Sequence, residues 1–245
     1  MTAPIRVDTV TFTDETDIEK IARDALSGSG GFGSYPRDRA PVDWIFRAYP
    51  ELIGTPYADR LAHGVAVCLT DAEPEIRAQA LLFFECQPLA AGGERLVELA
   101  AGDRALFAGV PDPLRTGVDL EWQLLAALGA RLVGDDAGID VARAEVLRTG
   151  KAQPVIGGLF AAAPDWVIHN AEAIVRGTPR AGITLLVAVQ RSGADLVEFG
   201  CRIAPLCHGD DHFERDLPRA IDDPAVRRAV LDAFAASAND NDATP

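Results

Sequence analysis

The side chains best suited to chemistry gather near position 205 of the 245-residue chain. Cys201, Cys207, His208 and His212 supply thiol and imidazole groups, and four such ligands could hold a zinc ion. Their spacing, C-x5-C-H-x3-H, matches no common zinc module, and Cys201 lies among apolar residues, as a buried structural cysteine does. We therefore expect no metal and no cofactor. A small zinc enzyme using Cys207, His208 and His212 remains the alternative interpretation.

A second pattern, G-x-G-x-x-G over residues 28–33, has the spacing of a dinucleotide-binding loop. Such a loop follows a strand and opens a helix, so that the phosphates meet the helix N-terminus. Here a helical pattern precedes the glycines and Pro36 follows them closely. The pattern therefore predicts a loop that ends a helix, with Phe32 and Tyr35 available to contact a partner. Since no serine lies in a G-x-S-x-G context either, we predict no catalytic residues.

Acidic side chains are concentrated in the polar segment 207–217, which we expect to be a loop. One interpretation is a solvated turn whose acids cap the following helix. The other is a docking surface for a basic protein, because loops between helical hairpins carry the contacts of many repeat proteins. The candidate partner-binding residues are Asp210, Asp211, Glu214, Asp216, Phe32 and Tyr35.

The formal net charge of −14 limits the classes of partner. A surface this negative repels phosphate backbones and anionic membranes, so we expect neither nucleic acid nor membrane as a partner. It attracts and steers a positively charged protein. The sequence shows no secretory leader and no apolar run long enough to cross a bilayer, which favours a cytoplasmic location.

The elements that must position these residues are predicted to be helices. Hydrophobic residues make up 48% of the chain and are mostly alanine and leucine, the strongest helix formers, whereas aromatic residues reach only 7%. A short extended arm, possible as a strand, is expected within 1–13. Proline and glycine punctuation then predicts a helix pair over 56–87 and further helices near 139–149, 154–162, 164–176, 179–191, 194–206 and 224–236.

A phrase that occurs twice, at 73–81 and at 223–231, indicates how these helices are arranged. Each copy has an acid, a proline, a β-branched residue and an arginine, a combination that starts a short helix with one buried face. The phrase and the paired-helix spacing at 56–87 and 218–236 resemble HEAT-type repeats, including their alanine-rich, arginine-bearing second helix. The resemblance implies a protein–protein scaffold or binding module.

The fold class predicted from these observations is all-α, with irregular stacked helical hairpins that form either a HEAT-like α-solenoid or a compact helical bundle. We expect a single helical-repeat domain over 1–236, with an N-terminal cap (1–54), stacked helices (55–236) and a flexible tail (237–245). The predicted function is a non-catalytic protein–protein interaction module for a basic partner. An immunity protein or inhibitor for a basic bacterial toxin, or a chaperone for a secreted effector, is the sharper version of this hypothesis.

Overall fold

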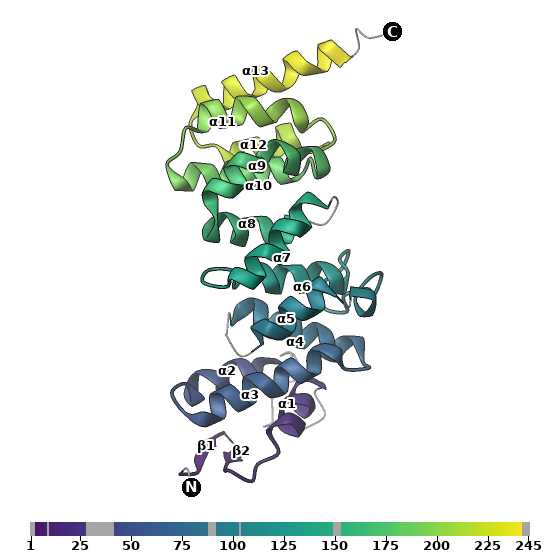
Figure 1. Ribbon diagram of the computed structural model, residues 1–245, viewed down its shortest axis with the longest axis vertical. Coiled ribbons are helices and arrows are strands. Elements are labelled where there is room, and N and C mark those ends of the chain that lie inside the picture. The colour runs from purple at the N-terminus through teal and green to yellow at the C-terminus, as the bar shows by residue number, and fades with distance from the viewer. Residues whose placement is uncertain are drawn as a thin grey trace. The chain divides into compact units, whose positions relative to one another are not determined.

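The computed structural model describes residues 3–8, 10–27, 42–87, 92–102, 104–148 and 153–241. Within these residues the chain is all-α apart from one two-stranded sheet near the N-terminus (Figure 1), which confirms the predicted fold class and N-terminal strand. The chain divides into two compact units, Met1–Arg131 (unit 1) and Leu132–Pro245 (unit 2). Each is described by itself, and the single domain over 1–236 stays a prediction. No helix in the described ranges is long and apolar enough to cross a membrane.

Unit 1 begins with the strand pair and continues as helices. Its elements are β1 (Ile5–Val7), β2 (Val10–Phe12), α1 (Ile18–Ser27), α2 (Val42–Leu52), α3 (Pro56–Val67), η1 (Cys68–Thr70), α4 (Pro74–Cys86), α5 (Gly93–Ala101), η2 (Arg104–Leu106) and α6 (Leu120–Gly129). The strands are antiparallel, with Ile5 opposite Phe12. Phe12 is fully buried and its ring lies 6.5 Å from that of Trp44 in α2 and 6.0 Å from that of Tyr57 in α3. The hairpin therefore closes one end of the unit 1 core.

Local sequence explains where α3 begins and how tightly it packs. Thr55 is its N-cap, with the hydroxyl oxygen accepting the Tyr57 amide at 3.3 Å, and Pro56 occupies the first turn, where a missing N–H costs nothing. In the middle of α3, Gly64 faces α1. A Cβ placed there would lie 3.1 Å from the Cβ of Ala22 and 3.2 Å from the carbonyl oxygen of Ile18. The absence of a side chain thus allows α1 and α3 to approach closely.

The first copy of the repeated phrase forms a polar network at the α3–α4 connection. Arg77 is only 4% exposed, and its Nη1 donates to the carbonyl oxygens of Asp71 (2.7 Å) and Ala72 (3.1 Å). Arg23 of α1 donates to the carboxylates of Asp71 (2.8 Å) and Glu73 (2.8 Å). Burial would raise the pKa of Asp71, but hydrogen bonds from the Glu73 amide and Arg23 outweigh it and hold that pKa below its usual range. The network joins α1 to the connection between α3 and α4.

Unit 2 consists of helices and one short 3-10 turn within its described residues. Its elements are α7 (Asp136–Leu147), α8 (Gln153–Ala162), α9 (Pro164–Gly177), α10 (Ala181–Ser192), α11 (Leu196–Ile203), η3 (Ala204–Leu206), α12 (Phe213–Ala220) and α13 (Pro224–Asn241). The helix α12 corrects the loop expected over 207–217. Phe213, Leu217 and Ala220 recur on one face and are buried, which stabilises a helix despite the acids on its other face.

The second copy of the phrase opens α13 but makes different contacts. Asp223 caps the helix by accepting the Ala225 amide at 2.7 Å. Arg227 is half-buried, and its side chain forms no hydrogen bond with a described residue, whereas the Nη1 of Arg77 donates to two carbonyl oxygens. Among the described elements, α13 packs mainly against α11, η3 and α12, whereas α4 contacts α1, α2, α3, η1 and α6. The helix also continues to Asn241, beyond the end predicted at 236.

Candidate functional site

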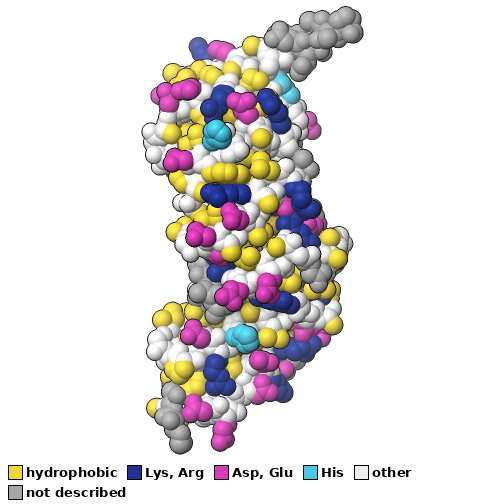
Figure 2. All heavy atoms as spheres, in the orientation of Figure 1, with side chains coloured by type: hydrophobic (Ala, Val, Ile, Leu, Met, Phe, Trp, Pro, Cys, Tyr) yellow, Lys and Arg dark blue, Asp and Glu magenta, His cyan; other side chains and the backbone are white. Residues whose placement is uncertain are grey.

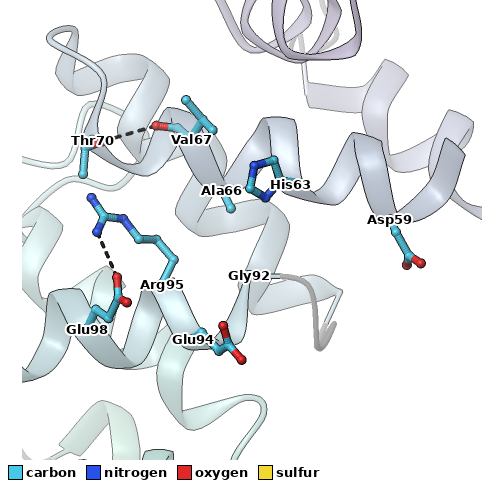
Figure 3. Close-up of a pocket in the computed structure, with 9 residues that line it drawn as sticks. All are labelled: Asp59, His63, Ala66, Val67, Thr70, Gly92, Glu94, Arg95 and Glu98. Carbon is cyan, nitrogen blue, oxygen red and sulfur yellow. Dashed lines mark hydrogen bonds and ion pairs between the residues drawn. The ribbon is translucent and has the colours of Figure 1, made fainter. Parts of the chain in front are cut away.

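A groove of about 740 Å³ runs along α3 on the described surface of unit 1. Figure 3 shows its two walls, one from α3 and η1 and the other from the first turns of α5. The lining residues are Asp59, His63, Ala66, Val67, Thr70, Gly92, Glu94, Arg95 and Glu98. Asp59, His63 and Val67 are four residues apart along α3 and all are exposed, as expected for one face of a helix.

The charged side chains of this groove are only partly neutralised. Arg95 donates to Glu98 across one turn of α5 at 3.0 Å, and Figure 3 shows this pair beside Thr70. Asp59 and Glu94 are exposed, and neither forms an ion pair with a described residue. The groove therefore presents two carboxylates that have no cationic partner within the described chain.

A second groove, of about 360 Å³, lies on the other side of α3 and shares Asp59 and His63 with the first. Its further lining residues are Thr16, Asp17, Ile18, Glu19 and Arg60. The guanidinium of Arg60 is engaged in the fold, since it donates to the carbonyl oxygens of Thr13 (3.3 Å) and Thr16 (2.9 Å). We call the two grooves together the α3 face. Its lining has five acids (Asp17, Glu19, Asp59, Glu94, Glu98) against two arginines, an excess of three negative charges.

The α3 face offers groups that can bind a cation. His63 forms no hydrogen bond with any described residue, so no described carboxylate orients it as a general base. Thr70 donates its hydroxyl to the carbonyl oxygen of Val67 at 3.3 Å, a local helix contact. Exposed carboxylates above the apolar side chains of Ala66 and Val67 can accept an arginine or lysine and cover its aliphatic stem.

The six residues predicted to bind a partner are not equally placed. Phe32 and Tyr35, with the glycine-rich loop, lie outside the described residues. Asp210 is 7% exposed, and its Oδ1 accepts the His212 amide at 3.1 Å and lies 3.9 Å from Nε of Arg180. The carboxylate of Asp210 therefore stabilises the turn that precedes α12.

Asp216 is also engaged within unit 2. Arg215 donates to it at 3.1 Å and Arg219 lies 3.7 Å away, and the hydrogen bond from Arg215 is the main cause that lowers the pKa of Asp216. Asp211 and Glu214 are exposed and have no ion pair with a described residue. Only these two of the predicted acids therefore remain available to a cationic partner.

Two residues of the zinc alternative, Cys207 and His208, have separate structural partners. The Sγ of Cys207 is buried and donates to the carbonyl oxygen of Ile203 at 3.4 Å, and burial raises the pKa of this thiol to about 12. The Nε2 of His208 lies 2.6 Å from the hydroxyl of Ser237, and its ring lies 4.2 Å from that of Phe234. In the part of the chain that is described, no three His, Cys, Asp or Glu side chains are arranged to hold a metal. The geometry does not support the zinc alternative.

No motif in the sequence indicates the α3 face, although its polar residues leave one signal. Asp59 and His63 are four positions apart in a helix whose other residues are apolar except Arg60, so the polar face of α3 could be identified. That Glu94 of α5 lies across the groove from it depends on how the helices pack, which no local pattern encodes.

No protein-family model, curated protein or solved structure matches this chain.

Proposed function

We propose that this chain is a non-catalytic protein–protein interaction module of HEAT-like stacked helical hairpins, which binds a basic partner through the α3 face. The observation that supports this proposal most directly is the pair of adjacent grooves with five acids and two arginines. Both arginines are engaged, one with Glu98 and the other with backbone carbonyls, so they do not offset Asp59 and Glu94.

The charge of the whole chain favours the same partner. Figure 2 shows acidic side chains spread over the visible face of both units, with fewer basic ones between them. A net charge of −14 raises the association rate of a cationic protein, by roughly 10- to 1,000-fold where steering is strong. Local carboxylates in a groove then determine where the partner docks, because they accept charge-assisted hydrogen bonds from its arginines. Within this proposal, the partner is a basic bacterial toxin or a secreted effector.

The exposed acids of unit 2 are a secondary part of the proposal. Asp211 and Glu214 add negative charge to the surface around α12 and strengthen long-range attraction. We propose that the contacts that determine the position of the partner come from the α3 face, where the grooves offer apolar and charged surface together.

The experiment begins with capture of a partner from an extract of the native host on the immobilised chain at low salt. Its association rate is then measured at several ionic strengths for the wild type and two double variants. Asp59→Asn/Glu94→Gln removes the free carboxylates of the groove. Glu51→Gln/Glu75→Gln removes two exposed acids of unit 1 outside both grooves and changes the net charge equally.

We expect the wild-type rate to fall steeply with added salt, because the attraction is screened over about 8–10 Å. The affinity of Asp59→Asn/Glu94→Gln for the partner should be lower than that of the control variant by about tenfold or more. Association that does not respond to ionic strength, or equal losses in the two double variants, would refute the proposal.

A further inference from the structure

Unit 2 has a groove whose chemistry is opposite to that of the α3 face. It has a volume of about 650 Å³ and lies between α8 and α10. Its lining residues are Gly157, Phe160, Ala161, Pro164, Ile183, Thr184, Val187, Ala188, Arg191 and Ser192. Phe160 is nearly buried, Ile183 and Val187 are half-buried, and Gly157 and Ala161 are exposed, so this is an open, mostly apolar channel on the surface.

Charge is almost absent from the two helices that form this groove. In a chain with 24% charged residues, α8 contains none and α10 contains only Arg191. Arg191 is exposed and forms no hydrogen bond or ion pair with any described residue. Its side chain lines the groove in the last turn of α10. A ligand of this groove must therefore be apolar along most of its length and carry an acidic group where it meets Arg191.

We propose that the α8–α10 groove binds one amphipathic α-helix of a partner protein, with apolar side chains along the groove and an acidic side chain paired with Arg191. The lining residues of α10 extend from Ile183 to Ser192, a distance of about 14 Å along the helix axis. Between two and three turns of a ligand helix cover that distance with two or three side chains spaced three and four residues apart.

The lining explains why the occupant is helical. The groove is lined by residues of α8 and α10 and by Pro164 of α9, and the interior backbone groups of these helices are already hydrogen-bonded. An extended peptide laid on it would leave its own N–H and C=O groups unpaired against apolar atoms, which is unfavourable for each group. A helix satisfies its backbone internally and presents only side chains.

Two other occupants fit less well. A second copy of the chain would bring another net charge of −14 to the interface, and like charge opposes self-association. A small molecule would remain mostly open to water, because Gly157, Ala161, Arg191 and Ser192 at the rim are exposed, whereas binding pockets enclose about 70–90% of a small ligand. This inference is independent of the α3 face, since it concerns a different unit and a ligand of the opposite charge.

The probe is an alanine-based helical peptide of about 15 residues, with leucines spaced three and four apart on one face and a glutamate on that face in its last turn. A second peptide has lysine in place of the glutamate. Binding to the full chain is followed by fluorescence anisotropy. Gly157→Leu fills the groove, since nothing lies within 4 Å of a Cβ at that position, and Arg191→Glu reverses its charge. The matched controls are Ala173→Leu and Arg176→Glu, an exposed alanine and an exposed last-turn arginine on α9 outside the groove.

The glutamate peptide should bind the wild type, the two control variants and the Asp59→Asn/Glu94→Gln variant with equal affinity. Gly157→Leu and Arg191→Glu should each weaken it by about tenfold or more, and Arg191→Glu should prefer the lysine peptide. The far-UV circular dichroism of each variant verifies that the fold is retained. The proposal is overturned if neither peptide binds, if the groove variants and controls behave alike, or if Gly157→Leu instead dissolves a dimer of the wild-type chain.

Discussion

Replacing Arg77 with alanine tests the structural role of the first copy of the repeated phrase. The guanidinium is buried and its Nη1 is the hydrogen-bond donor to the carbonyl oxygens of Asp71 and Ala72, at 2.7 and 3.1 Å. A hydrogen bond from a charged donor contributes about 1.5–3 kcal/mol net. The carbonyl of Ala72 belongs to an exposed residue and can be rehydrated, so we count one such bond in full and add the lost packing of the aliphatic stem. The free energy of unfolding of unit 1 should fall by about 2–4 kcal/mol.

The second copy of the phrase supplies the matched control. Arg227 occupies the corresponding position, but it is half-buried and lacks the two carbonyl acceptors that Nη1 of Arg77 has. Arg227→Ala should therefore lower the free energy of unfolding by less than about 1 kcal/mol, as a substitution at a partly exposed site does.

Urea unfolding of both variants is followed by far-UV circular dichroism, with Trp fluorescence as a second probe. A Trp166→Phe background leaves Trp44 and Trp122, both of unit 1, as the fluorescent reporters. The dependence of the unfolding free energy on urea should stay unchanged if only stability is affected. A loss below about 0.5 kcal/mol for Arg77→Ala, or equal losses for the two arginines, would refute the assignment of a structural role to this network.

Three further predictions concern pH, packing and thiol reactivity. The pKa of Asp71 is lowered in the folded chain, because hydrogen bonds outweigh burial. Its contribution to stability is therefore present above the unfolded carboxyl pKa of about 4 and is lost as the pH falls through the folded pKa. An acid titration monitored by circular dichroism should show a steeper loss of stability for the wild type than for Asp71→Asn. Gly200→Ala places a Cβ 2.6 Å from a methyl group of Val230 in α13, and it should lower the melting temperature because the clash costs about 1–3 kcal/mol. Gly157→Ala has open space around its Cβ and should raise the melting temperature, since alanine favours a helix more than glycine does. Equal shifts for the two variants would contradict this packing. Cys86 is exposed and should react first with a thiol reagent at pH 8. Burial raises the pKa of Cys207 to about 12, so this thiol should react only on unfolding. Rapid labelling of Cys207 in the folded Cys86→Ala variant would disprove this.

Much of the helical framework could be predicted from local sequence. Thr55 followed by Pro56 predicts where α3 begins, because a cap and a first-turn proline act within a few residues of each other. The prediction of a loop over 207–217 was wrong at α12. It relied on the polar, acidic composition of this segment, although apolar residues recur there every three or four positions and form a buried face. Composition was the weaker guide there, since the spacing of apolar residues determines whether a helix can be buried.

The candidate sites depended on information that no local pattern carries. Sequence alone placed Asp210, Asp211, Glu214 and Asp216 in one acidic segment, but the fold buries the first and pairs the last with Arg215. In the same way, two copies of one phrase have arginines in different surroundings, because their helices have different neighbours.

The sequence by itself determined that this chain forms short helices with capped starts, a buried stripe and an acidic surface, because capping, periodicity and charge act over a few residues or sum over the whole chain. Only the tertiary structure decided which charges stay unpaired and where two helix faces enclose a groove. The α3 face and the α8–α10 groove both join residues from helices that are not consecutive in the chain. Their proximity follows from side-chain packing between helices, which depends on the shapes of all the neighbours at once.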